Sequence, residues 1–252
     1  MTTMWGAPVR TRWAAWRGSR RDPRQARFLT VASLRWVIRN RAWTPWYLVR
    51  YQRLLRFRLA NPHVILHGMV FLGRGVEIHC RPGFGRLEIG KWVHIGDGNS
   101  IRCHEGSLRI GDKVVFGKDN TINCYLDVEL GDAALVADWV YICDFDHVIA
   151  DIHQPIKDQG IAKAPVRIGP GTWVGTKVSV LKGTRIGRGA VLGAHAVVRG
   201  EIPDYAIAVG IPARVVRDRR ADYEADAQRR AAVADMSRKA AQALQDSLRD
   251  QA

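Results

Sequence analysis

The sequence predicts an all-β solenoid, a parallel β-helix with helices at both ends of the chain, and two observations carry this prediction. An aliphatic residue recurs every six positions from Ile168 to Val198, in the run IGPGTW, VGTKVS, VLKGTR, IGRGAV, LGAHAV, VRGEIP. The same register returns upstream in shorter runs that begin at Ile89, Ile110 and Leu130. A helix needs apolar spacings of three and four, and a half-buried strand needs a spacing of two. A period of six over this length fits neither, and it predicts a repeat.

The repeat unit is a short strand followed by a tight corner, with one aliphatic side chain per strand pointing inward. Three such strands close a triangular coil of about eighteen residues, and a coil buries its aliphatic residues only by stacking on the next one. Glycine follows the aliphatic residue at several repeats, as in IGPG and IGRG. We expect this glycine to supply backbone freedom at the corner.

The first part of the chain, residues 1–62, is predicted to be helical and strongly basic. The whole chain of 252 residues carries a net charge of +15. Most of this charge lies in residues 1–60, which hold fourteen Arg, one acidic residue (Asp22) and six of the nine Trp. Thr44-Pro45 is a good N-cap and N1 pair for a helix. The expected apolar stripes of two helices are Val31, Leu34 and Ile38, then Leu48, Tyr51, Leu55 and Leu59.

Two roles fit these basic helices, and both can hold at once. They can lie on an anionic membrane surface, or they can cap the open end of the first coil, as solenoids require. No apolar run approaches the length of a membrane span. We therefore expect a cytoplasmic protein, with peripheral contact at the inner face of the membrane through residues 1–60 as the open alternative.

The body of the chain, residues 63–217, is expected to form the β-helix, with one break. After Cys143-Asp144-Phe145-Asp146-His147 the sixfold register stops, and it resumes at Val166. Residues 149–165, IADIHQPIKDQGIAKAP, contain two Pro and mixed charge, which predicts a loop that leaves the coil with His147 at its root. Cys143 occupies the small-residue position after Ile142, so we expect it to pack rather than react.

The last part, residues 218–252, is predicted to form an Ala-rich helix of mixed charge. It is expected to pack on its own subunit or on a neighbouring one through a seam of Val233, Met236, Ala240, Ala243 and Leu248. The four cysteines of the chain show no paired spacing, which predicts free thiols and no metal site.

The repeat resembles that of the hexapeptide-repeat acyltransferases over roughly residues 64–217. The likeness is sharpest over 166–217, where the ending VGIPARVVR is similar to the terminal signature of the galactoside and maltose O-acetyltransferase group. The resemblance implies a left-handed parallel β-helix, although the usual crossover is right-handed. It also implies a homotrimer that moves an acetyl or other short acyl group from acetyl-CoA or another acyl-CoA to a saccharide or glycolipid.

In that family a catalytic histidine stands just before the loop, which makes His147 the candidate general base. A sugar hydroxyl must lose its proton as it attacks a thioester, and imidazole accepts a proton near neutral pH. Asp144 or Asp146 is expected to fix the tautomer of His147 or to bind substrate hydroxyls. The family also implies an Asn that orients the acceptor, and Asn123 is the candidate for that role.

The resemblance further implies a set of residues that hold the acyl-CoA donor. Backbone and small side chains would hold the pantetheine arm, and guanidinium groups suit the phosphates. No separate nucleotide-binding signature is present, so the nucleotide would arrive as part of acyl-CoA. The candidates are Thr176, Ala194, Arg199, Gly200, Arg214 and Arg217.

Four other functions fit parts of the pattern. A nucleic-acid-binding protein would explain the charge, but the basic stretch matches no reader motif and the body is near neutral, so no nucleic acid is expected. A zinc-dependent carbonic anhydrase of the same fold needs three converging His, and the spacing here provides no obvious set. A serine O-acetyltransferase and a non-catalytic β-helix binding protein remain alternatives. The identity of the acceptor and the acyl chain length stay open.

Overall fold

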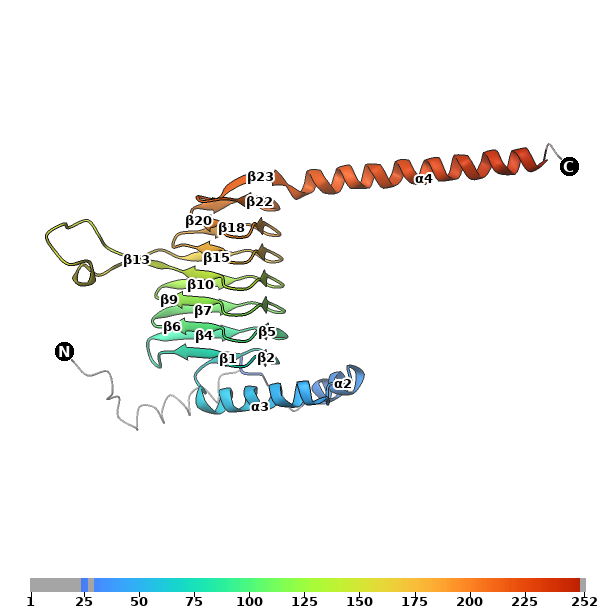
Figure 1. Cartoon of the computed structure of the whole chain (residues 1–252). Coiled ribbons are helices and arrows are strands. Elements are labelled where there is room, and N and C mark those ends of the chain that lie inside the picture. Colours follow the sequence, from blue (N-terminus) through green and yellow to red (C-terminus); the bar gives the residue numbers. More distant parts are fainter. Residues whose placement is uncertain (1–23, 27–29, 250–252) are drawn as a thin grey trace.

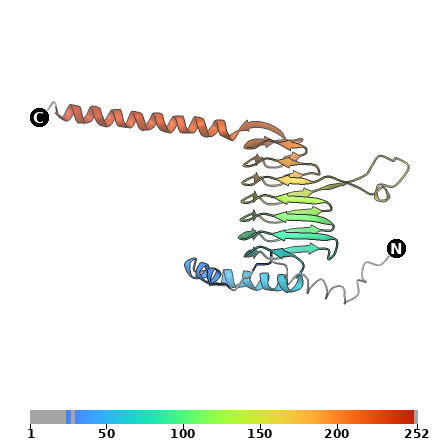
Figure 2. The same cartoon turned by 180° about the vertical axis from the view of Figure 1, so that it is seen from behind.

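The computed structural model describes residues 24–26 and 30–249, and side chains as far as residue 237. The body is a prism of stacked coils, and each full coil adds one strand to each of three parallel sheets (Figures 1 and 2). Sheet A contains β1 (Ile65–Leu66), β4 (Gly85–Ile89), β7 (Gly106–Ile110), β10 (Asp127–Leu130), β15 (Val166–Ile168), β18 (Arg185–Ile186) and β21 (Glu201–Ile202). This confirms the predicted all-β solenoid.

Sheets B and C follow sheet A in every turn. Sheet B contains β2 (Val70–Leu72), β5 (Val93–Ile95), β8 (Val115–Phe116), β11 (Leu135–Val136), β16 (Trp173–Val174), β19 (Val191–Leu192), β22 (Ala206–Val209) and the antiparallel β23 (Arg214–Asp218). Sheet C contains β3 (Glu77–Cys80), β6 (Ser100–Cys103), β9 (Thr121–Cys124), β12 (Tyr141–Cys143), β17 (Ser179–Val180) and β20 (Val197–Val198). We call the edge where sheet B turns into sheet C the BC edge, and the edge where sheet C turns into sheet A the CA edge.

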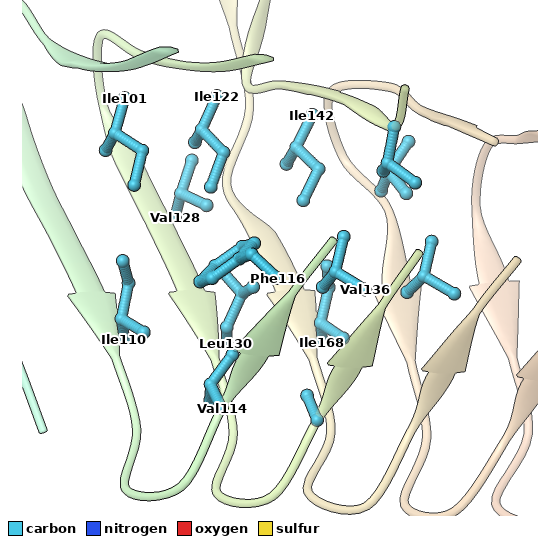
Figure 3. Close-up of a cluster of buried hydrophobic side chains, with 14 of the residues drawn as sticks. Ile101, Ile110, Val114, Phe116, Ile122, Val128, Leu130, Val136, Ile142 and Ile168 are labelled. Carbon is cyan, nitrogen blue, oxygen red and sulfur yellow. The ribbon is translucent and has the colours of Figure 1, made fainter. Parts of the chain in front are cut away.

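The core is a set of aliphatic columns that run along the axis of the prism. In sheet C, Ile101 pairs with Ile122, Ile122 with Ile142, and Ile142 with Val180, and all are buried (Figure 3). Full burial of such a side chain contributes about 1.5–3 kcal/mol. Because most strands supply only one or two buried side chains, a coil is stable only against its neighbours.

The coils are not all eighteen residues long, which corrects the sequence prediction. In sheet A the register partners Ile168 and Ile186 are eighteen residues apart, but Ile89 and Ile110 are twenty-one residues apart. The early coils have longer strands in sheets A and C. The longer strands keep the inward column in register while they widen these two faces.

The glycines after the aliphatic residues have a different role from the one expected. Gly96 does not have a positive φ, so its backbone conformation is open to other residues. However, a Cβ at Gly96 would collide with the carbonyl oxygen of Gly117 in the next coil. Close approach of successive corners, and not backbone freedom, therefore requires glycine here.

Helices α2 (Val31–Arg39) and α3 (Pro45–Ala60) lie across the first coil (Figure 1). Leu54 of α3 is buried in the core, and the Trp36 ring lies 4.4 Å from the Trp92 ring and 6.0 Å from the Phe71 ring. The helices thus cap the open end of the solenoid. Their predicted apolar stripes mostly face away from this contact, with Val31, Leu34, Ile38, Leu48, Leu55 and Leu59 all more than half exposed.

The C-terminal helix α4 (Arg219–Arg249) projects away from the other end of the solenoid (Figure 1). Val233 and Met236 are exposed, so this part of the seam does not pack on its own subunit. The side chains of Ala240, Ala243 and Leu248 lie outside the described residues. Packing on a neighbouring subunit stays a prediction.

Among the helices of the described part of the chain, none has both the length and the apolar character needed to cross a membrane.

Candidate active site

The break in the repeat is a hairpin that leaves the solenoid at the CA edge (Figure 1). Strand β13 (Phe145–His147) pairs antiparallel with β14 (Ile161–Lys163), and His147 lies opposite Ile161. The chain therefore leaves the coil at Phe145 rather than at residue 149, and the segment between the two strands is mostly exposed. This places His147 beyond the prism, where its side chain is exposed.

The root of the hairpin is held by Asp144, which is fully buried. Its carboxylate accepts hydrogen bonds of 2.8 Å from the backbone N–H groups of Tyr125, Leu126 and Asp127. These donors belong to the corner of the preceding coil. The expectation that Asp144 contacts substrate or His147 is therefore wrong, because its oxygens are committed to this corner.

A column of aromatic rings runs along the CA edge and ends at His147. The His104 ring stacks 4.6 Å from the Tyr125 ring, the Tyr125 ring lies 4.5 Å from that of Phe145, and the Phe145 ring lies 6.4 Å from that of His147. Burial, with help from nearby Arg102, lowers the pKa of His104. A lowered pKa favours the neutral form of the His104 imidazole. In that form the ring stacks on Tyr125 without burying a charge.

Two ion pairs fix the hairpin to the prism from either side. The Lys163 ammonium lies 2.8 Å from the Glu105 carboxylate, and this lysine lowers the pKa of Glu105. The Asp146 carboxylate lies 3.6 Å from the Lys182 ammonium. Asp146 is therefore close to His147 along β13 but is engaged with the next coil. Within the described residues, no side chain forms a hydrogen bond with the His147 ring.

Asn123 lies on the outer face of sheet C, beside the root of the hairpin. It is the register partner of Cys143, which is buried and donates to the Phe145 carbonyl at 3.2 Å. Cys143 is thus packed, as expected. Burial, and then the Cys143 thiol, raise the pKa of Tyr141 to about 12, while the Asn123 amide opposes this shift. Asn123 and Tyr141 thus place neutral polar groups on the outer face of sheet C, next to Cys143.

The residues expected to bind the donor are not brought together in one subunit. Thr176 and Ala194 lie on the BC edge, and the Thr176 hydroxyl donates to the Asp138 carbonyl at 2.9 Å. Arg199 and Gly200 lie on the CA edge, between β20 and β21. Sheet C separates these two edges.

The two remaining candidates, Arg214 and Arg217, lie on β23 at the end of the solenoid, and both are exposed. The Arg217 guanidinium lies 3.6 Å from the Asp222 carboxylate. These two positions are also apart from His147.

Sequence reasoning missed several residues that shape these edges. Tyr125, Glu105 and Lys163 hold the hairpin, and Lys177 lies over the Trp139 ring at 5.5 Å on the BC edge. Their positions at successive corners are readable from the repeat, but their partners depend on which coils adjoin. In the described part of the chain, no group of three or more His, Cys, Asp or Glu residues is placed to hold a metal ion.

The anchoring by Asp144 predicts a large effect on stability. Asp144→Ala removes a fully buried carboxylate, leaves three N–H groups of the corner without their acceptor, and should lower the free energy of unfolding by about 3–5 kcal/mol. The matched variant Asp146→Ala removes a half-exposed ion pair and should cost no more than about 1 kcal/mol. Urea denaturation of both variants measures this difference. Equal losses would contradict the structural role of Asp144.

Comparison with known proteins adds three findings. The family "Bacterial transferase hexapeptide (six repeats)" matches residues 165–200. The "Probable acetyltransferase Rv3034c" of Mycobacterium tuberculosis is 70% identical over 246 residues, which cover 96% of this chain and 81% of that protein. The "Putative lipopolysaccharide biosynthesis O-acetyl transferase WbbJ" of Escherichia coli is 35% identical over 121 residues, 42% of this chain and 62% of that protein.

A solved structure shares the fold. A single-residue mutant of AntD, an N-acyltransferase from Bacillus cereus, superposes with a TM-score of 0.53 at 16% identity, over 69% of this chain and 96% of that one. It was solved in complex with dTDP-4-amino-4,6-dideoxyglucose and coenzyme A. At this identity the likeness concerns the fold alone.

Proposed function

Because the chain belongs to the hexapeptide-repeat acyltransferases, we propose that it moves an acetyl or other short acyl group from acyl-CoA to a saccharide or glycolipid hydroxyl. The observation that carries this proposal is the exposed imidazole of His147 on a hairpin that breaks the solenoid. The names of two relatives, an acetyltransferase and a lipopolysaccharide O-acetyl transferase, support the reaction and the acceptor class. The coenzyme A bound to AntD supports the donor.

His147 acts as the general base in this reaction. Its ring nitrogen accepts the proton of the acceptor hydroxyl while that oxygen attacks the thioester carbonyl. The new C–O bond forms, the C–S bond breaks, and the proton passes from the imidazolium to the departing CoA thiolate. Positioned proton transfer of this kind is worth about 10²–10⁴ in rate.

Replacement of His147 tests this role. His147→Ala should lower kcat by about 10²–10⁴ and leave the Kd for acetyl-CoA nearly unchanged. His153→Ala, an exposed histidine of the same hairpin loop, is the matched control and should keep wild-type turnover. The assay follows CoA release with hydroxyl and amine sugars as separate acceptors. Near-normal turnover of His147→Ala would contradict the assignment, and transfer to amines alone would contradict the O-acyl specificity.

The active form is proposed to be a homotrimer in which neighbouring copies complete the site. His147 projects from the CA edge, while Thr176 and Ala194 lie on the BC edge of the same prism. In the proposed arrangement, a donor held along the BC edge of one copy reaches His147 of a neighbouring copy. Thr176, Ala194, Arg199, Gly200, Arg214 and Arg217 remain the proposed donor contacts under this arrangement.

The outer face of sheet B supports contact between copies. Val115, Leu135 and Trp173 are register partners on three successive coils, and each is more than a third exposed. An exposed apolar ladder of this kind is typical of an interaction surface. The charged residues of sheet A offer no comparable apolar contact.

A mixing experiment tests the shared site. His147→Ala should be nearly inactive because it lacks the base. Ala194→Trp should be nearly inactive because a large side chain on the BC edge would block the proposed donor position. Co-expression should restore about a quarter of wild-type turnover, because random trimers place an intact BC edge beside an intact His147 at that frequency. Two His147→Ala chains carrying different tags are the control. Activity no higher than that of the separate variants would contradict a site built from two copies.

We also propose peripheral contact of α2 and α3 with the inner face of an anionic membrane. Their exposed stripes, with Leu55 58% and Leu59 61% exposed, lie on the side away from the first coil. Arg35, Arg39 and Arg56 lie on the same helices, and residues 24–76 contain no acidic side chain. Each basic residue near such a surface contributes about 1 kcal/mol, weakened by salt. The residues of this segment before Arg24 lie outside the described residues.

Liposome co-sedimentation tests this contact. The wild-type protein should bind anionic liposomes at low salt and much less at high salt or on neutral lipid. Changing Leu48, Leu55 and Leu59 together to Ser should abolish binding, since these side chains would enter the lipid. The matched control changes Ile149, Ile152 and Ile156 to Ser, which are comparably exposed on the hairpin, and should bind normally. Binding that is absent in the wild type, or equal in both variants, would contradict the proposal.

A further inference from the structure

The three outer faces of the prism differ in chemistry, and sheet A is the charged and internally paired one. The Arg109 guanidinium lies 2.7 Å from the Glu129 carboxylate and 3.2 Å from that of Asp127, which also pairs with Arg167. Glu88 accepts from Arg86 and lies 3.0 Å from His67. These charges satisfy one another, and the face has little left to offer a ligand.

Sheet C, next to the hairpin, carries mainly neutral and basic polar groups, with Glu77 as the one acidic residue in its strands, all of which the structure describes. Its first outward ladder runs in register from Glu77 through Ser100, Thr121 and Tyr141 to Ser179, and in it the Ser100 hydroxyl is buried. Its second outward ladder consists of His79, Arg102 and Asn123, again in register. Hydroxyl, amide, imidazole and guanidinium groups thus form two parallel rows on one face.

The basic side chains of the second ladder differ from Arg86, Arg109 and Arg167 of sheet A, which are ion-paired. Within the part of the chain that the structure describes, His79 and Arg102 form no side-chain ion pair or hydrogen bond. An outward guanidinium and imidazole of this kind can donate hydrogen bonds to ligand oxygens, because no existing hydrogen bond has to be broken first. The lack of acidic partners for these two described side chains favours a ligand rich in oxygen acceptors.

A cleft lies at the foot of the same face. Its volume is about 480 Å³, and it lies between α3 and the first coil. Arg53, Arg56 and Phe57 line it from α3, and Glu77 and His79 line it from β3. His79 therefore belongs both to the cleft and to the second ladder. The Phe57 ring with charged and polar side chains around it is a composition typical of a site for a small ligand.

The root of the hairpin lies further along the same face, after β12. The second ladder ends at Asn123, because the next register position is Cys143, which is buried. The chain then leads to His147 four residues later. Cleft, ladders and hairpin form one continuous path along the prism axis.

We infer that the outer face of sheet C binds an extended saccharide chain that runs from the cleft at α3 to the hairpin at His147. The inference rests on the proposed acyl transfer and specifies its acceptor as an oligosaccharide. Parallel strands are about 4.8 Å apart, so the path from β3 to β12 is about 14 Å long. Along this path the outward groups that a saccharide can meet are His79, Arg102 and Asn123 of the second ladder and the hydroxyls of Thr121 and Tyr141, spaced at roughly one coil per pyranose ring.

Calorimetric titration of the full-length protein, without acyl-CoA, tests this site. The probes are linear gluco-oligosaccharides and oligogalacturonides, each as disaccharide, tetrasaccharide and hexasaccharide. We expect Kd to fall from the disaccharide to the tetrasaccharide in at least one series and to change little beyond it, because the path is then filled. Arg102→Ala should weaken tetrasaccharide binding about ten- to a hundredfold, the value of a hydrogen bond to a charged group. Arg185→Ala, at an exposed arginine on sheet A, should bind as the wild type does.

The outcomes separate this inference from the proposed function. Affinity that does not depend on chain length, absence of binding in both series, or equal effects of Arg102→Ala and Arg185→Ala would overturn the inference. Acyl transfer to short sugars would still stand in that case. Length-dependent binding without any transfer from acyl-CoA would uphold the site and overturn the reaction. If Arg102→Ala does not fold, His79→Ala gives the same comparison at the lower end of the path.

Discussion

The structure depends on one constraint: each inward aliphatic side chain must stack on its counterpart in the next coil. A strand of two to five residues buries too little surface to be stable alone, and Ile122 is buried because Ile101 and Ile142 lie on either side of it. The constraint fixes the register of every strand and brings the corners so close that Gly96 cannot carry a side chain. It leaves the outward residues free to vary, which is why the three faces of the prism differ.

The same constraint decides where a segment that leaves the solenoid can be inserted. A break inside a strand would interrupt the column, whereas a break at a corner interrupts nothing if the chain returns in register. The hairpin meets this condition, because β12 precedes it and β15 resumes beside β10. Asp144 replaces the lost corner contacts with three hydrogen bonds to the preceding coil. His147 is thereby displaced from the prism, while the root of the hairpin is held by Asp144.

Much of the fold could be predicted because the repeat is periodic in sequence. The period of six identified the inward column from Ile168 onward, and the break after Cys143 marked the hairpin. The early coils were harder to predict from the sequence. Their extra residues lengthen the spacing between inward aliphatic residues, although those residues still stack in register in the structure. Asp144 was misassigned because a buried carboxylate that binds backbone N–H groups has no signature in sequence. The partners of Tyr125 and Lys163 could not be predicted either, because they come from coils about twenty to sixty residues away. The two helices of the N-terminal segment formed where the sequence predicted them. However, their apolar stripes are exposed, and the residue that α3 buries against the first coil is Leu54, which was not in the predicted stripe.

The central claim is that two copies of the chain share one acyl-transfer site. A crystal structure of the protein with bound CoA tests this most directly. The account predicts that the pantetheine arm lies along Thr176 and Ala194 of one copy, with its thiol beside His147 of the neighbouring copy. A CoA molecule held by a single copy, or one whose thiol is remote from every His147, would contradict the account.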